Sequence, residues 1–177
     1  MTKKQVASLI TVFIVVLSVF AVSAQSISGV FSFSRGSLIL SGTIRGLGNV
    51  SNNAFYSTLT GTAQVTALCQ NRGGNVAPGQ NPVVVLVSKT SPPLAPDSNG
   101  NADVWITITD AEVSAAFVAG SYSARDVGCP NNNWTVIGME NASARWVAAT
   151  VNVYENSALA LQYSVGCVDD GVTLSCN

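Results

Sequence analysis

The segment from Phe55 to Cys69 alternates between two kinds of residue along almost its whole length. Its odd positions are mostly small or apolar, and its even positions carry Tyr, Thr or Gln until Leu68 breaks the rule. A period of two places these sets on opposite faces of a β-strand, one buried and one solvated, as in an antiparallel sheet. Gly61 lies within the run and predicts a bulge or bend in this long strand.

Eight further segments have strand-like patterns, and turn residues separate them. They span residues 30–34, 37–45, 82–89, 102–109, 134–139, 144–154, 158–167 and 172–176. Strands at this spacing without intervening helices predict an all-β fold, a single antiparallel β-sandwich of the immunoglobulin-like kind. One segment is ambiguous: Thr109 and Glu112 fit a capping box, so a short helix begins there or the preceding strand continues.

The amino terminus has the features of a secretory signal. Lys3 and Lys4 precede an apolar run from Val6 to Val22, and small residues end at Ala24. Cleavage there is expected to leave one secreted domain, residues 25–177; a membrane anchor is the competing interpretation. That domain has six basic and nine acidic residues. This balance argues against nucleic acid as a partner, because binding to phosphates needs clustered Lys and Arg.

Four cysteines remain after the expected cleavage. An even number in an exported protein favours two disulfides, with three possible connectivities. Cys167 and Cys176 flank a predicted hairpin turn at Asp170-Gly171, so we expect them to pair. By elimination Cys69 would then bond Cys129.

The residue types present limit the chemistry of the protein. There is no histidine, which removes the usual catalytic triad and most zinc sites, and no cofactor is expected. The acidic pairs at residues 169–170 and 110–112 could hydrolyse a glycosidic bond, but they are better explained as turn and helix-cap residues. Calcium could use the oxygens of Asp97, Asn99, Asn101 and Asp103, but a turn through Asn99-Gly100 is favoured. We therefore expect no enzymatic activity.

Two amide-rich loops form the candidate binding site. Cys69 to Pro82, "CQNRGGNVAPGQNP", and Cys129 to Trp134, "CPNNNW", would be held together by the Cys69–Cys129 bridge. The predicted ligand-binding residues are Asn71, Arg72, Asn75, Gln80, Asn81, Asn131, Asn132, Asn133 and Trp134. Amides and an indole suit a neutral, hydroxyl-rich ligand such as a sugar. The competing interpretation is that Trp134 is buried and the amides only form turns.

Trp105 and Trp146 lie inside alternating strands, and we expect them in the core or on a sheet face. Asn49, Asn133 and Asn141 begin glycosylation sequons, which matter only in a eukaryotic secretory pathway. A glycan on Asn133 would block the proposed sugar surface.

The motifs "CQNRGGNVAPGQNP", "NGNADVWITIT" and "CPNNNWT" resemble those of a group of small, uncharacterised secreted proteins of actinomycete-type bacteria. The resemblance covers about Gly46 to Tyr154. It implies secretion and a β-sandwich, with Cys69–Cys129 as a shared bridge, and it carries no activity or site residue. Cys167 and Cys176 depart from the simplest members of the group.

These observations predict a secreted, extracellular binding or structural module that acts at a cell surface, wall or matrix. Its expected partner is a polysaccharide or cell-surface glycan, and no membrane association is expected after signal cleavage. The alternatives are a self-assembling surface or filament protein that pairs through exposed strand edges, with "VFSFS" at residues 30–34 as the donor strand, and a glycoside hydrolase.

Overall fold

The computed structural model describes residues 27–34, 37–48 and 54–177. The predicted signal peptide, residues 35–36 and the sequon at Asn49 lie outside the described residues. Within the described residues, no helix is both long and apolar enough to span a bilayer.

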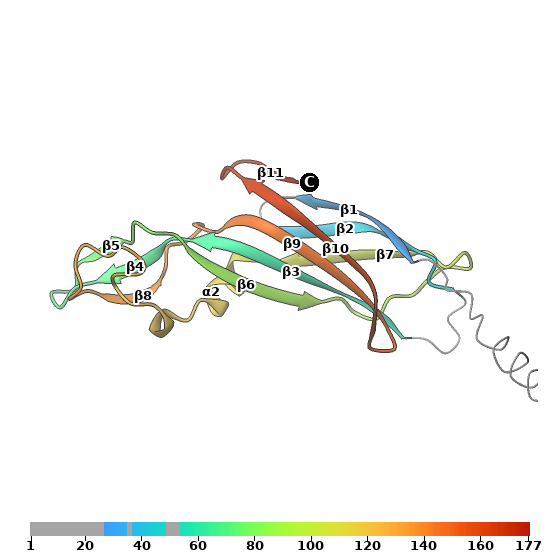
Figure 1. Cartoon of the computed structure of the whole chain (residues 1–177), viewed down its shortest axis with the longest axis horizontal. Coiled ribbons are helices and arrows are strands. Elements are labelled where there is room, and N and C mark those ends of the chain that lie inside the picture. The colour runs from blue at the N-terminus through green and yellow to red at the C-terminus, as the bar shows by residue number, and fades with distance from the viewer. Residues whose placement is uncertain (1–26, 35–36, 49–53) are drawn as a thin grey trace, which may run out of the picture.

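The strands form three antiparallel sheets (Figure 1). The three-stranded sheet has the order β1 (Ser28–Ser34), β2 (Leu38–Arg45) and β7 (Ala102–Ile108). The five-stranded sheet has the order β11 (Leu174–Cys176), β10 (Ala158–Asp169), β9 (Arg145–Glu155), β3 (Phe55–Val65) and β6 (Val83–Thr90). A small end sheet has the order β5 (Val76–Pro78), β4 (Ala67–Gln70) and β8 (Thr135–Met139). The predicted antiparallel all-β sandwich is confirmed.

The hydrophobic core lies between the three-stranded and five-stranded sheets. Strands β2, β3 and β7 show this most clearly, because each buries the apolar half of its alternating pattern, which the period of two places on one face. The largest fully buried side chains are Trp146, Phe55, Leu38, Leu40, Ile44, Leu59, Ile108, Val65, Val113, Val127, Val151 and Val153. The other half of each pattern therefore covers the outside of the sandwich, where any binding surface on these sheets must lie.

Gly61 packs against the largest core side chain. A Cβ atom at residue 61 would lie 2.5 Å from Cζ3 of Trp146 and 2.7 Å from Cδ2 of Leu38. The β3–β9 pairing also shifts register between Thr62 and Ala63, which confirms the predicted irregularity of this strand. The missing side chain at residue 61 makes room for the indole of Trp146.

The long alternating run does not form one strand. It divides at Thr66 into β3, in the five-stranded sheet, and β4, in the end sheet. The end sheet therefore extends from one end of the sandwich (Figure 1). Its β5 strand, Val76–Pro78, was not predicted, because three residues within a Gly- and Pro-rich stretch carry no readable alternation.

Both predicted disulfides are confirmed. Cys69 bonds Cys129 with a Cα–Cα distance of 5.8 Å and ties the end sheet to the segment before β8. Cys167 bonds Cys176 between directly paired positions of β10 and β11. No free cysteine remains among the described residues.

The ambiguous segment after β7 is helical. The α2 helix spans Asp110–Ala116 and is followed by a 3-10 turn, η2, at Ala119–Ser121. The backbone N–H of Glu112 donates to Thr109 Oγ1, and the backbone N–H of Thr109 donates to a carboxylate oxygen of Glu112. This is the predicted capping box. Lys89 of β6 forms an ion pair with the same carboxylate at 2.7 Å and fastens the helix to the five-stranded sheet.

Candidate binding surface around Trp105

The first predicted loop forms the turn between β4 and β5. Asn71 Oδ1 accepts hydrogen bonds from the backbone N–H groups of Gly73 and Asn75, both at 2.9 Å. Gly74 has a φ of 82°, the left-handed conformation that glycine adopts most easily. The Asn71 amide oxygen therefore stabilises the turn, while the side chains of Arg72 and Asn75 are exposed.

The second half of that loop lies against the Cys129 segment, as predicted. The backbone N–H groups of Gln80 and Asn81 donate to the carbonyls of Gly128 and Val127 at 3.1 and 3.0 Å. The Asn81 side-chain amide donates to the Asp126 carbonyl at 3.1 Å. The backbone of this region is thus held in place by hydrogen bonds as well as by the disulfide.

The three consecutive asparagines, Asn131, Asn132 and Asn133, are exposed, and Asn131 Oδ1 accepts from the backbone N–H of Asn133 at 2.9 Å. Trp134 is half-buried and packs against the core. β4 and β8 pair Gln70 with Thr135, so the two predicted loops extend from the same end of the end sheet. The structure brings these loops together, and some of their side-chain amides, those of Asn71 and Asn131, bond the backbone of their own turns.

Trp105 is the most exposed aromatic residue among the described residues. It lies in the middle of β7, on the outer face of the three-stranded sheet, and 67% of its surface is accessible. Its neighbours in β7, Val104 and Ile106, point into the core. An indole that contacts solvent rather than core is an unusual use of so large an apolar surface, and it marks a candidate binding surface.

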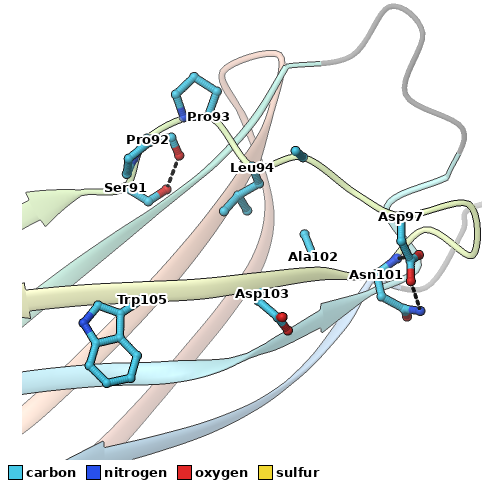
Figure 2. A pocket seen from close by; sticks show the side chains of 10 residues that line it. Ser91, Pro92, Pro93, Leu94, Asp97, Asn101, Ala102, Asp103 and Trp105 are labelled. Atoms are coloured by element: carbon cyan, nitrogen blue, oxygen red, sulfur yellow. Dashed lines mark hydrogen bonds between the residues drawn. The ribbon is translucent and has the colours of Figure 1, made fainter.

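An open cavity of about 480 Å³ lies beside Trp105 (Figure 2). On the far side from the three-stranded sheet it is bounded by the segment from Ser91 to Ala95, which links β6 to β7 and contributes Pro92, Pro93 and Leu94. On the near side it is bounded by β7 itself through Ala102, Asp103 and Trp105. The cavity thus combines flat apolar side chains with a few polar groups, the composition usual for small-ligand sites.

The polar groups of the cavity are two carboxylates, one amide and one hydroxyl. Asp97 Oδ1 accepts from the backbone N–H groups of Asn99 and Asn101, both at 2.8 Å, and Asp97 Oδ2 accepts from Asn101 Nδ2 at 3.2 Å. These bonds from Asn101, backbone first, hold the pKa of Asp97 below its ordinary value. Asp97 therefore stays ionised and organises the predicted turn at Asn99-Gly100.

Asp103 is placed differently. It is exposed on the outer face, and one of its oxygens, Oδ1, accepts from Thr43 Oγ1 of β2 at 2.9 Å. An ionised carboxylate accepts about four hydrogen bonds. Asp103 can therefore accept further hydrogen bonds from a ligand bound beside Trp105.

Of the acidic residues that could form a hydrolytic pair, Asp169, Asp170 and Glu112 accept hydrogen bonds from backbone N–H groups. Asp169 accepts from the backbone N–H groups of Trp146 and Gly171, and Asp170 accepts from those of Val172 and Thr173. Glu112 is bonded by Lys89 and by Thr109, which lower its pKa to about 2. Among the described residues, no three His, Cys, Asp or Glu side chains gather as metal ligands.

The strand considered for self-assembly, residues 30–34, lies within β1. All seven residues of β1 pair with β2 of the same chain. Within the described residues no strand is hydrogen-bonded to its other edge, so β1 is an edge strand of the three-stranded sheet. Pairing between subunits through this edge stays a hypothesis.

The sequence itself contains a signal for the exposure of Trp105, although Trp105 lies outside the two amide-rich loops. Residues 102, 104, 106 and 108 are the apolar set of β7, so Trp105 shares a face with Asp103 and Thr107. A tryptophan in the polar half of an alternating strand is expected to face solvent.

Comparisons of the chain with protein-family models, with curated proteins and with solved structures found no match. The resemblance to secreted actinomycete proteins therefore stays a prediction.

Proposed function

We propose that this protein is a secreted, non-catalytic module that binds a carbohydrate at the outer face of its three-stranded sheet. The observation that carries the proposal is the exposed indole of Trp105 beside an open cavity with hydrogen-bonding side chains. A sugar ring presents an apolar face of C–H groups and an edge of hydroxyls. An indole provides apolar contact for the face, and the Asp103 carboxylate and the Asn101 amide beside it pair with the edge.

Secretion fits the two disulfides, which form and persist in oxidising compartments. The low content of charged residues, 10% of the chain, fits a surface whose interactions depend on hydroxyls and amides rather than on ion pairs. Asp169, Asp170 and Glu112 accept hydrogen bonds that fix turns and a helix cap, which supports binding rather than turnover.

The test is retention of residues 25–177 on insoluble cellulose, chitin, xylan and peptidoglycan. We expect Trp105→Ala to weaken binding roughly 30-fold, because truncating a central aromatic contact costs about 2 kcal/mol. The melting temperature of this variant is expected to stay close to that of the wild type, because Trp105 is mostly exposed.

Trp134→Ala is the matched control, since it removes the same side chain from the amide-rich loops. We expect it to keep binding while its unfolding temperature falls, because Trp134 packs on the core. Loss of binding in Trp134→Ala but not in Trp105→Ala would move the site to the two loops. Retention on none of the four polysaccharides would count against the proposed function.

A further inference from the structure

The cavity beside Trp105 continues across the three-stranded sheet. A second open cavity, of about 380 Å³, shares Asp103 and Trp105 with the first. A third, of about 310 Å³, shares Ser41, Gly42 and Thr43 with the second. The first lies beyond β7, the second between β7 and β2, and the third between β2 and β1. Because each adjoins the next, together they form one groove, which we call the cross-strand groove.

The strand register explains the course of this groove. Val30, Thr43 and Asp103 occupy paired positions of β1, β2 and β7, and Ser32, Ser41 and Trp105 do so one row further along. Both rows point to the outer face, so they form two walls that run across the strands. Neighbouring strands are about 4.8 Å apart, so the groove extends about 10 Å over the sheet before it reaches the cavity beyond β7.

The chemistry changes along the groove. The end beyond β7 has the indole of Trp105 and the prolines. The middle has three hydroxyl groups. The Thr43 hydroxyl donates to Asp103, and the hydroxyl oxygens of Ser32 and Ser41 are 2.8 Å apart. Each hydroxyl has one donor and two acceptor positions, so these bonds leave capacity for a ligand. The far end has the exposed guanidinium of Arg45, which offers several donors.

This arrangement does not suit a peptide strand or an apolar protein surface. β2 is hydrogen-bonded to β1 on one side and β7 on the other, so its backbone offers a peptide no ladder partners across the groove. Among the described residues of these three strands, Val30 and Trp105 are the exposed large hydrophobic side chains, too few for a dry protein interface. The remaining fit is an extended ligand with hydroxyls along its length.

We propose that the cross-strand groove binds a polysaccharide along its chain, with the Trp105 cavity as one subsite and the Thr43–Arg45 region as another. This inference rests on the proposed function and adds that the ligand is a polymer, held across several sugar units. Binding energy is then distributed along the groove, so affinity rises with the length of the oligosaccharide until the groove is filled.

The experiment is titration calorimetry of residues 25–177 with cello-, xylo- and chito-oligosaccharides, from the monosaccharide to the hexasaccharide. We expect Kd to fall stepwise with chain length. Arg45→Ala is expected to weaken binding of the hexasaccharide about fivefold, the loss of one exposed hydrogen-bonding contact. It is expected to leave the disaccharide unaffected, because the disaccharide occupies the Trp105 end alone.

Arg72→Ala is the matched control, because Arg72 is an exposed arginine in the turn of the end sheet, outside the cross-strand groove. Equal affinity for short and long oligosaccharides, with no effect of Arg45→Ala, would overturn the extended groove. If Trp105→Ala still weakened binding in that case, the proposed function would stand with a single-sugar site. Equal losses in Arg45→Ala and Arg72→Ala would show a general charge effect and also overturn the groove.

Discussion

At the residue scale, the three tryptophans show how the side of a strand decides the role of a side chain. Trp146 is out of phase with the buried residues Ala149, Val151 and Val153 of β9, and the register shift opposite Thr62 and Ala63 turns it into the core, where it is 2% exposed. Trp105 belongs to the polar half of β7 and is 67% exposed. Trp134 precedes β8 and is half-buried against the core. The same indole therefore contributes core volume at residue 146 and a free apolar face at residue 105.

The close packing of Gly61 against Trp146 leads to a prediction at the residue scale. Gly61→Ala is expected to lower the free energy of unfolding by about 1–3 kcal/mol, because the added methyl group overlaps the Trp146 ring in a packed core. Urea denaturation measures this loss. Gly138→Ala in β8 is the control, since a Cβ there meets nothing within 4 Å. A fully stable Gly61→Ala variant would show that the ring can move aside at little cost.

At the element scale, α2 depends on one carboxylate. Glu112 completes the capping box with Thr109 and pairs with Lys89 of β6, which joins a seven-residue helix to the sheet. A helix this short is not stable alone, so its cap and its docking contacts decide whether it forms. The sequence predicted the cap because its residues are three apart. It did not predict the ion pair, because Lys89 and Glu112 belong to different elements.

The pH dependence of stability tests the charge on Glu112. Its pKa is lowered from 4.5 to about 2 by the Lys89 contact and the Thr109 backbone, so its stabilising effect is complete above pH 4.5 and is lost as the pH falls toward 2. Glu112→Gln keeps a capping side chain but removes the charge. We expect it to be about 0.5 kcal/mol less stable at neutral pH, a small figure because both partners are partly exposed.

Chemical denaturation of both proteins between neutral pH and pH 2 measures the effect. The difference in the free energy of unfolding is expected to close as Glu112 of the wild type becomes protonated. A difference that stays constant over this range would assign the loss to packing or hydrogen-bond geometry rather than to charge.

At the scale of the whole molecule, the two disulfides close chain loops of very different length. Cys69–Cys129 closes a loop with a sequence separation of 60, and Cys167–Cys176 one of 9. On the loop-entropy model these contribute at most about 4 and about 2.6 kcal/mol. The first also holds the end sheet to the segment before β8, whereas the second joins two strands that already pair.

Replacing both cysteines of each bridge by alanine tests this difference. We expect the Cys69→Ala/Cys129→Ala protein to melt at a lower temperature than the Cys167→Ala/Cys176→Ala protein, as measured by calorimetry. We expect the first variant, if folded, to keep carbohydrate binding, because the Trp105 surface lies on the three-stranded sheet and not on the end sheet (Figure 1). Loss of binding together with an unchanged melting temperature would instead link the end sheet to the site.

The all-β class, most strands, the helix cap and both disulfides could be read from local patterns. Alternation over a few residues determines which side chains share a face, and turn chemistry determines where the chain reverses. Even the exposure of Trp105 follows from its place in the β7 pattern. These features depend on residues close together in sequence, apart from the Cys69–Cys129 bridge, which followed by elimination.

The tertiary structure decided where the faces meet. The cross-strand groove needs Thr43, Asp103 and Trp105 from strands some 60 residues apart, and only the β2–β7 register places them together. The division of the long strand at Thr66 likewise follows from β4 pairing with β8 rather than from the alternation, which continues through it. A local pattern says which way a side chain points, but its neighbours across the sheet depend on long-range pairing and register, which no short segment encodes.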